Sequence, residues 1–73
     1  MEWERIKANW PHFKVLARVR WRLISAEEFE LIDGRREALA RQIAEVYRVS
    51  QAMAQMQLES WQALQHEPQA HSA

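Results

Sequence analysis

The chain contains almost nothing that would interrupt a helix. Its 73 residues include one glycine and two prolines, whereas Ala, Arg, Gln, Glu, Leu and Met are abundant. The abundant residues favour helix by intrinsic propensity, while glycine and proline are the usual helix breakers. The sequence therefore predicts an all-α fold, a compact array of four to five short helices arranged as orthogonally packed helical hairpins.

The first two helices are expected to meet at Asn9. A short opening helix is predicted over residues 2–8, and Asn9 is a favourable N-cap for the helix that follows. Pro11 then falls in the first turn, where its missing N–H costs nothing. This second helix is predicted to run to about Leu23.

Two serines and the glycine mark the later boundaries. The run Ser25-Ala26-Glu27-Glu28 forms a capping box, in which the serine hydroxyl accepts a hydrogen bond from an amide of the first turn. Gly34 adopts the left-handed conformation without steric cost, so it is predicted to end the third helix. Ser50 is the predicted N-cap of the closing helix.

Apolar residues recur at spacings of three and four along the predicted helices, which places them on one face of each helix. The residues predicted to point inward are Trp10, Phe13, Ala17, Trp21, Ile24, Phe29, Ile32, Leu39, Ile43, Val46, Tyr47, Ala54, Leu58 and Trp61. Leu64 is expected to extend the last stripe, and Met53 and Met56 to widen it. Because each tryptophan can bury about 200 Å², the four indoles are interpreted as core rather than as an aromatic ligand box.

Residues 1–64 are predicted to form a single domain. Residues 65–73 lack an apolar period and contain Pro68, so they are expected to be a disordered tail. The absence of cysteine excludes disulfides and thiolate metal sites. The longest apolar runs are two or three residues, so neither a signal peptide nor a membrane span is expected, and the predicted location is the cytoplasm.

Many of the residues predicted to mark helix boundaries or to form the core also match, in order, a known sequence pattern that begins M-x-W-x-x-I-x-x-N-W-x-x-F-K. The matching positions over about residues 1–62 are Met1, Trp3, Ile6, Asn9, Trp10, Phe13, Lys14, Trp21, Ser25, Glu27, Glu28, Ile32, Gly34, Arg36, Leu39, Ile43, Tyr47, Ala54 and Trp61. The chain thereby resembles the CsbD-like family. The resemblance implies a small helical bundle and a place in the bacterial general stress response, and it supplies no catalytic or ligand residues.

The chain departs from that family pattern at four positions where glycine is common. They are occupied here by Val15, Arg22, Arg41 and Arg48. Replacing glycine removes roughly 1 kcal/mol of helix penalty at each helical site. The helices are therefore expected to run longer and stiffer than in relatives.

The polar residues do not form a pattern typical of catalysis. His66 and His71 are five apart rather than at the i, i+4 spacing of a helical metal pair. The carboxylates of residues 27–33 are explained by helix capping, and no serine has a histidine in a triad-like arrangement. We therefore expect no enzyme activity, no metal or other cofactor and no small-molecule substrate.

Two surface features are candidates for function. The first is a second apolar face of the second helix, formed by Val15, Leu16, Val19 and Leu23, which suits self-association, as a homodimer, or an unidentified protein partner. The second is a set of basic residues that could contact phosphate, namely Lys14, Arg18, Arg22, Arg35 and Arg36. Because the formal net charge is zero, helix-mediated protein interaction is the preferred hypothesis, and nucleic-acid binding through a basic helix face is the alternative.

Overall fold

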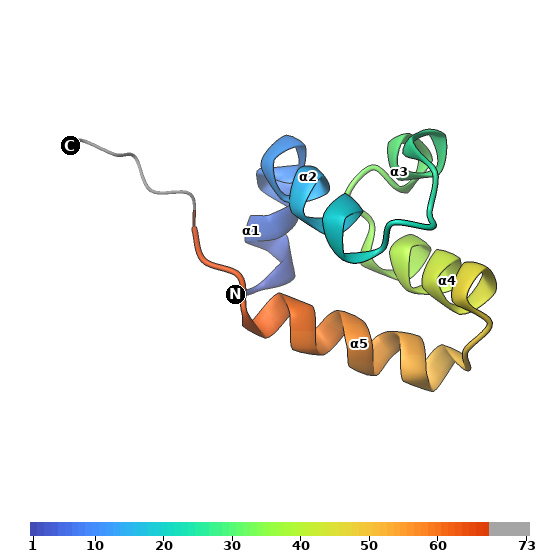
Figure 1. Ribbon diagram of the computed structural model, residues 1–73. Helices are drawn as coiled ribbons and strands as arrows, with labels where there is room; N and C mark the ends of the chain where they lie inside the picture. The colour runs from blue at the N-terminus through green and yellow to red at the C-terminus, as the bar shows by residue number, and fades with distance from the viewer. Residues whose placement is uncertain (68–73) are drawn as a thin grey trace.

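The computed structural model describes residues 1–67, and within them the chain forms five helices and no strand (Figure 1). The helices are α1 (Trp3–Ala8), α2 (Trp10–Arg20), α3 (Ala26–Ile32), α4 (Arg36–Tyr47) and α5 (Gln51–Ala63). This confirms the predicted all-α fold. The opening helix lies where it was predicted, directly before Asn9.

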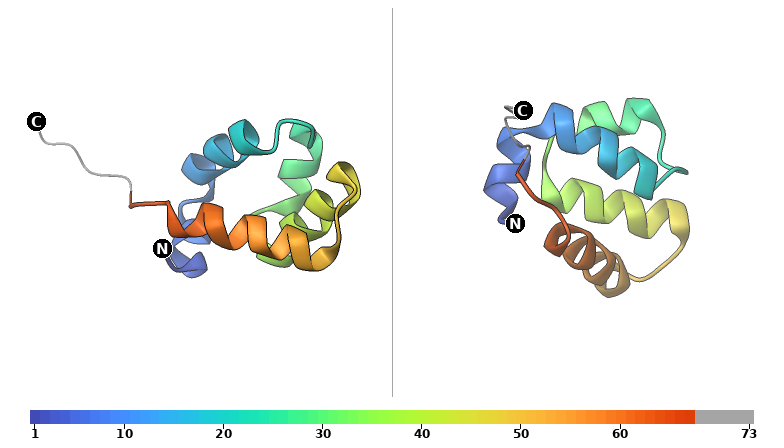
Figure 2. Two further views of the ribbon diagram at one scale, coloured as in Figure 1. Left: turned by 60° about the horizontal axis from the view of Figure 1, so that its bottom comes forward. Right: turned by 60° about the vertical axis from the view of Figure 1, so that its left-hand side comes forward.

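The helices pack mainly against their neighbours in the chain. Helices α4 and α5 form a hairpin, α3 packs on α4, and α2 packs on both α1 and α3 (Figures 1 and 2). The core is formed by the side chains that these helices bury between them. Its buried residues are Ile6, Trp10, Phe13, Ala17, Trp21, Ile24, Phe29, Ile32, Leu39, Ala40, Ile43, Ala54, Leu58 and Trp61.

Aromatic side chains join α5 to the N-terminal half. The Trp61 ring centroid lies 6.2 Å from that of Trp3, 6.5 Å from that of Phe13 and 5.5 Å from that of Trp21. Trp10, Trp21 and Trp61 are buried and Trp3 is half-buried. The interpretation of the tryptophans as core is therefore confirmed for three of the four.

Both serines cap helices as predicted. The Ser25 hydroxyl accepts from the Glu28 amide at 3.1 Å, and the Ser50 hydroxyl accepts from the Met53 amide at 3.0 Å. The prediction for Asn9 is wrong in its mechanism. Asn9 precedes α2, but its side-chain amide donates to the Arg5 carbonyl at 3.1 Å, which satisfies the end of α1 instead of the start of α2.

The second helix ends earlier than predicted. It stops at Arg20, and residues 21–24 form a turn in which Trp21 and Ile24 still point into the core. The Leu23 amide, freed from the helix, donates to the Tyr47 hydroxyl at 2.9 Å. Because α2 has already ended, the Leu23 N–H has no helical acceptor, and the Tyr47 hydroxyl supplies one.

The corner between α3 and α4 needs two left-handed residues. Asp33 (φ 47°) already leaves the helix, so α3 ends at Ile32, just before the predicted glycine, and Gly34 follows with φ 77°. A Cβ on Gly34 would lie 3.1 Å from the Lys7 Cγ atom. The left-handed backbone favours glycine here, and the space for a Cβ is tight. The Trp3 indole N–H donates to the Gly34 carbonyl at 2.8 Å and joins α1 to this corner.

The expectation that the helices would run on through the replaced glycines is wrong at two positions. Arg22 lies in the turn after α2, and Arg48 ends α4 in the left-handed conformation with φ 55°. The Arg48 and Val49 amides both donate to the Ala44 carbonyl, which closes α4 and turns the chain back into α5. Val15 and Arg41 do lie inside helices.

The predictions for the end of α5 need one correction. Leu64 does not extend the buried stripe, and Met53 and Met56 do not widen it, because all three side chains are exposed. Among the residues of the predicted tail, Glu67 pairs with Arg5. The rest of that predicted tail, residues 68–73, lies outside the described residues.

Candidate interaction surfaces

The sequence-predicted apolar face of α2 lies on the outside of the molecule. We call Val15, Leu16, Val19 and Leu23 the α2 outer face. Their exposed fractions are 57%, 38%, 68% and 68%. Val15, Leu16 and Val19 lie on the side of α2 opposite its buried stripe, so they have no place in the core. Leu23 does not continue this helix face as predicted, because α2 ends at Arg20 and Leu23 lies exposed in the turn that follows. Contiguous exposed aliphatic groups of this kind are typical of a binding surface.

Two arginines lie beside this face. An open hollow of about 560 Å³ is lined by Val15, Val19 and Ile24 together with Arg18 and Arg22. The structure thus brings together two of the five predicted basic residues, in contact with the predicted apolar face. A surface of this composition is suited to aliphatic side chains interleaved with carboxylates, since a guanidinium binds a carboxylate by two parallel hydrogen bonds.

Lys14 does not extend this arginine pair. Its amino group donates to the Glu30 carboxylate of α3, so the basic row of α2 is partly neutralised by the acidic segment that follows. The hydrogen bond and the charge of Lys14 lower the pKa of Glu30 below its ordinary value, and the charge of Arg18 adds a smaller effect. Both side chains of this ion pair are solvent-accessible, so it contributes little to stability.

Arg35 and Arg36 lie away from the α2 outer face and are engaged within the protein. The Arg35 guanidinium donates to the carbonyls of Ile32 and Leu31, at 3.1 and 2.6 Å, and so binds the end of α3. Arg36 donates to side-chain oxygens of α5, those of Gln62 and Gln55. These contacts give both arginines a role in joining helices.

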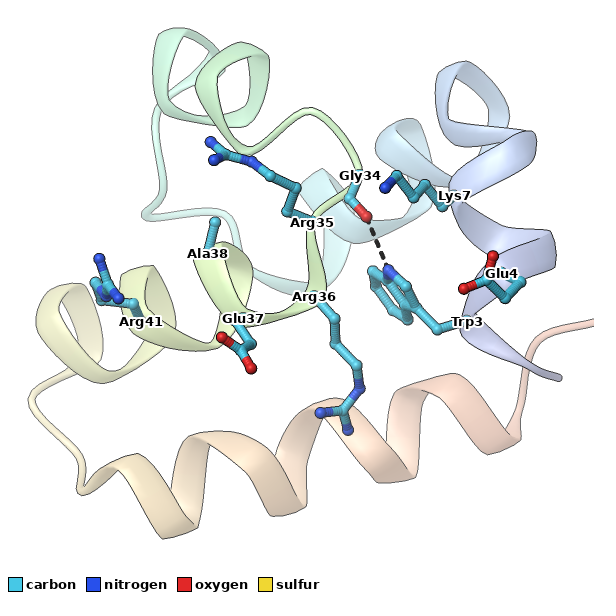
Figure 3. A pocket seen from close by; sticks show the side chains of 9 residues that line it. All are labelled: Trp3, Glu4, Lys7, Gly34, Arg35, Arg36, Glu37, Ala38 and Arg41. Carbon is cyan, nitrogen blue, oxygen red and sulfur yellow. Dashed lines mark hydrogen bonds between the residues drawn. The ribbon is translucent and has the colours of Figure 1, made fainter.

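A second hollow, of about 430 Å³, lies at the corner between α3 and α4 (Figure 3). Its lining includes Lys7 and Arg41, two basic residues outside the five predicted phosphate contacts. In Figure 3 the basic side chains point in different directions, and the carboxylates of Glu4 and Glu37 lie among them. This arrangement does not focus positive charge on one point, as a phosphate site requires.

Lys7 could not have been placed in this hollow from local spacing. It lies on α1, and it reaches the α3–α4 corner because Gly34 lets the backbone approach the Lys7 side chain. Trp3 also lines the hollow, but its indole N–H is bonded to the Gly34 carbonyl. The only sequence signal for this approach was the single glycine.

Residues 1–67 present neither a metal-binding cluster nor a membrane-crossing helix. No group of three or more His, Cys, Asp or Glu side chains in this part of the chain is placed to hold a metal ion. His66 is exposed, and His71 lies outside the described residues. None of the helices in residues 1–67 has the length and apolar character needed to cross a membrane.

The chain is similar to a UPF0337 protein of Rhodopseudomonas palustris. The two sequences are 26% identical over 61 residues, which is 84% of this chain and 92% of the relative. No protein-family model matches the chain, and no solved structure matches it. The similarity therefore covers nearly the whole described fold, at low identity.

Proposed function

We propose that this chain is a CsbD-like protein of the bacterial general stress response that acts in the cytoplasm by binding another protein, and not by turning over a substrate. Two observations support this proposal. The relative from Rhodopseudomonas palustris is a UPF0337 protein, and UPF0337 is the CsbD-like family. The ordered set of residues that resembles that family extends over about residues 1–62, a stretch of similar length to the match of 61 residues.

The observation that carries the proposal is the exposure of the α2 outer face. Val15 and Val19 each leave more than half of their surface to solvent on a helix whose other side is used by the core, and Leu23, in the turn after that helix, is equally exposed. Covering the four aliphatic side chains of this face would contribute on the order of 1 kcal/mol each, because they are about half exposed. A helix laid along α2 is the partner geometry that buries them together.

The charges beside this face favour an acidic partner. Helix α2 carries Lys14, Arg18 and Arg20, Arg22 follows in the turn, and residues 10–22 include no acid. A two-fold contact between α2 helices of two copies would bring these cations close to their own counterparts. The homodimer through this face is therefore the less favourable form of the proposal, and a helix with carboxylates near Arg18 and Arg22 is the more favourable one.

Nucleic-acid binding is the alternative, and one observation favours it: Arg18 and Arg22 line the same open hollow. Against it, Lys14, Arg35 and Arg36 are already engaged by groups of this chain. A phosphate interaction would weaken steeply as salt rises and would not depend on the aliphatic residues. A titration with a short duplex at low salt separates the two proposals.

The experiment places a photo-reactive side chain at Val19 and, as a matched control, at the equally exposed Leu31 on α3. Cross-linking in stressed cells identifies the protein captured from Val19 alone, and that protein is then purified and titrated. Val19→Glu and the double variant Arg18→Ala/Arg22→Ala should each lower its affinity about tenfold or more. Equal capture at both positions, or affinity indifferent to both variants, would contradict the proposal.

A further inference from the structure

Helix α5 has an outer face that is unusual for a solvent-exposed helix. Its 13 residues contain a single charge, Glu59. The side that faces away from the core carries Met53, Met56, Ser60 and Ala63, all exposed. We call these four residues the α5 seam. Loss of charge together with enrichment in methionine distinguishes the centre of a protein interface from ordinary surface.

The spacing within the α5 seam is that of a coiled coil. Its members follow one another at intervals of three, four and three, which is the pattern that keeps a narrow seam facing a partner helix. Glutamines lie between the seam and the buried stripe of Ala54, Leu58 and Trp61, with Gln55 and Gln62 on one flank and Gln57 on the other. Helix α5 is thus apolar on two opposite sides, although only one of them is covered by the described residues.

We propose that the α5 seam is a self-association surface, on which α5 of a second copy packs antiparallel about a two-fold axis level with Leu58. In this register Met53 lies opposite Ala63 of the second copy, and Met56 lies opposite Ser60 of the second copy. Every layer therefore pairs one large side chain with one small one, and the two-fold axis repeats each pairing. A parallel pairing would instead set methionine against methionine and leave the small residues facing each other.

Charge and position separate this surface from the α2 outer face. The α5 seam carries no charge that would repel its own copy, whereas α2 carries several cations. The buried sides of α2 and α5 meet through Phe13 and Trp61, whose ring centroids lie 6.5 Å apart, so their outer sides point away from each other (Figure 1). Self-association through α5 thus leaves the α2 outer face free, and it stands independently of the proposed function.

The dimer should be weak. A seam that extends only from Met53 to Ala63 on one short helix buries less than the ~800 Å² per partner of a standard stable interface. We therefore expect a concentration-dependent dimer with a dissociation constant on the order of 100 µM. Monomer would dominate in dilute solution.

Sedimentation equilibrium of the full chain over roughly 10 µM to 1 mM, a range set by this weak affinity, tests the proposal. The average mass should rise from 8.7 kDa toward twice that value. Met56→Glu should keep the protein monomeric throughout, while Leu31→Glu and Val19→Glu, which make the same change on other exposed apolar residues, should dimerise like the parent chain. A constant monomer mass for the parent, or a dimer that survives Met56→Glu, would overturn the proposal.

The absence of cysteine allows the register to be tested directly. Met56→Cys and Ser60→Cys are made as separate variants, mixed in equal amounts and oxidised, and the disulfide products are separated by mass. The antiparallel register brings residue 56 of one copy to residue 60 of the other, so the mixed disulfide should exceed its statistical share. Two homodisulfides in excess would indicate a parallel register and would refute the self-complementary pairing.

Discussion

Replacing Arg48 by glycine is expected to stabilise the protein, because the Arg48 backbone holds a conformation that is costly for any residue with a Cβ. Its φ angle is 55°, in the left-handed region. That conformation costs an L-residue about 1–2 kcal/mol. The side chain is exposed, so truncating it removes no core packing.

The gain is smaller than the full strain, because glycine also increases the entropy of the unfolded chain. That opposing effect is about 0.4–1 kcal/mol. The net stabilisation should therefore be about 0.5–1 kcal/mol. In a domain of this size it corresponds to a rise in Tm of about 2–8 °C.

Two matched variants make the same chemical change where the backbone is different. Arg41→Gly lies inside α4 and should destabilise by about 1 kcal/mol, since glycine weakens a helix interior. Arg22→Gly lies in a turn whose φ is not positive, so it should also destabilise. Urea unfolding of all three, followed by tryptophan fluorescence, gives the comparison. If Arg48→Gly is no more stable than the parent chain, or if Arg41→Gly gains as much, then strain at position 48 is not the cause.

Three further predictions concern the α3–α4 corner and the surface ion pair. Gly34→Ala should destabilise by about 1–2 kcal/mol or more in thermal unfolding, because it combines a left-handed backbone with a Cβ 3.1 Å from the Lys7 Cγ atom. Trp3→Phe should cost about 1 kcal/mol in urea unfolding, since it leaves the Gly34 carbonyl without its indole donor. Lys14→Met should raise the pKa of Glu30 toward its ordinary value in an NMR titration, and Arg18→Met should raise it less. Because the pKa of Glu30 is lowered in the folded state, the small stability from this pair is present above the ordinary glutamate pKa and is lost as pH falls through the lowered value.

The buried side of each helix was predictable because buried side chains recur at the spacing of the helical turn. The stripe from Trp10 to Ile24 and the stripe of Ala54, Leu58 and Trp61 were identified from spacing alone, and all their members are buried. Ser25 and Ser50 were equally clear, because a hydroxyl before an apolar run has one favourable use at a helix start. These are local rules, and the structure follows them.

The helix ends that were predicted wrongly depend on contacts between residues distant in sequence. Helix α2 stops at Arg20 while the Leu23 amide bonds to Tyr47, which lies 24 residues further along the chain. Arg48 adopts the left-handed conformation although arginine gives no signal for it, because α5 must return along α4. No single-residue preference contains this information.

The candidate surfaces were predictable in part for the same reason. The exposure of Val15 and Val19 followed from their place on α2 opposite the buried stripe, whereas Leu23 is exposed in the turn that follows. The basic set was predicted as a composition, but α3 directs Glu30 to Lys14, and α5 supplies glutamine oxygens to Arg36. Whether a basic residue is free for a partner is a property of the tertiary structure, which composition does not report.

The two outer faces differ in the way that decides what each one binds. Burying apolar area favours association on either face to a similar degree, so area does not choose the partner. Charge does select the partner. Arg18 and Arg22 repel the same arginines of a second copy and attract carboxylates, whereas the α5 seam has no charge that would repel a second copy. Because the two faces point away from each other, a dimer built on α5 would present two α2 outer faces. A partner with two acidic helices would then bind both faces at once. Even a weak dimer would therefore raise the affinity for that partner without any new contact on α2.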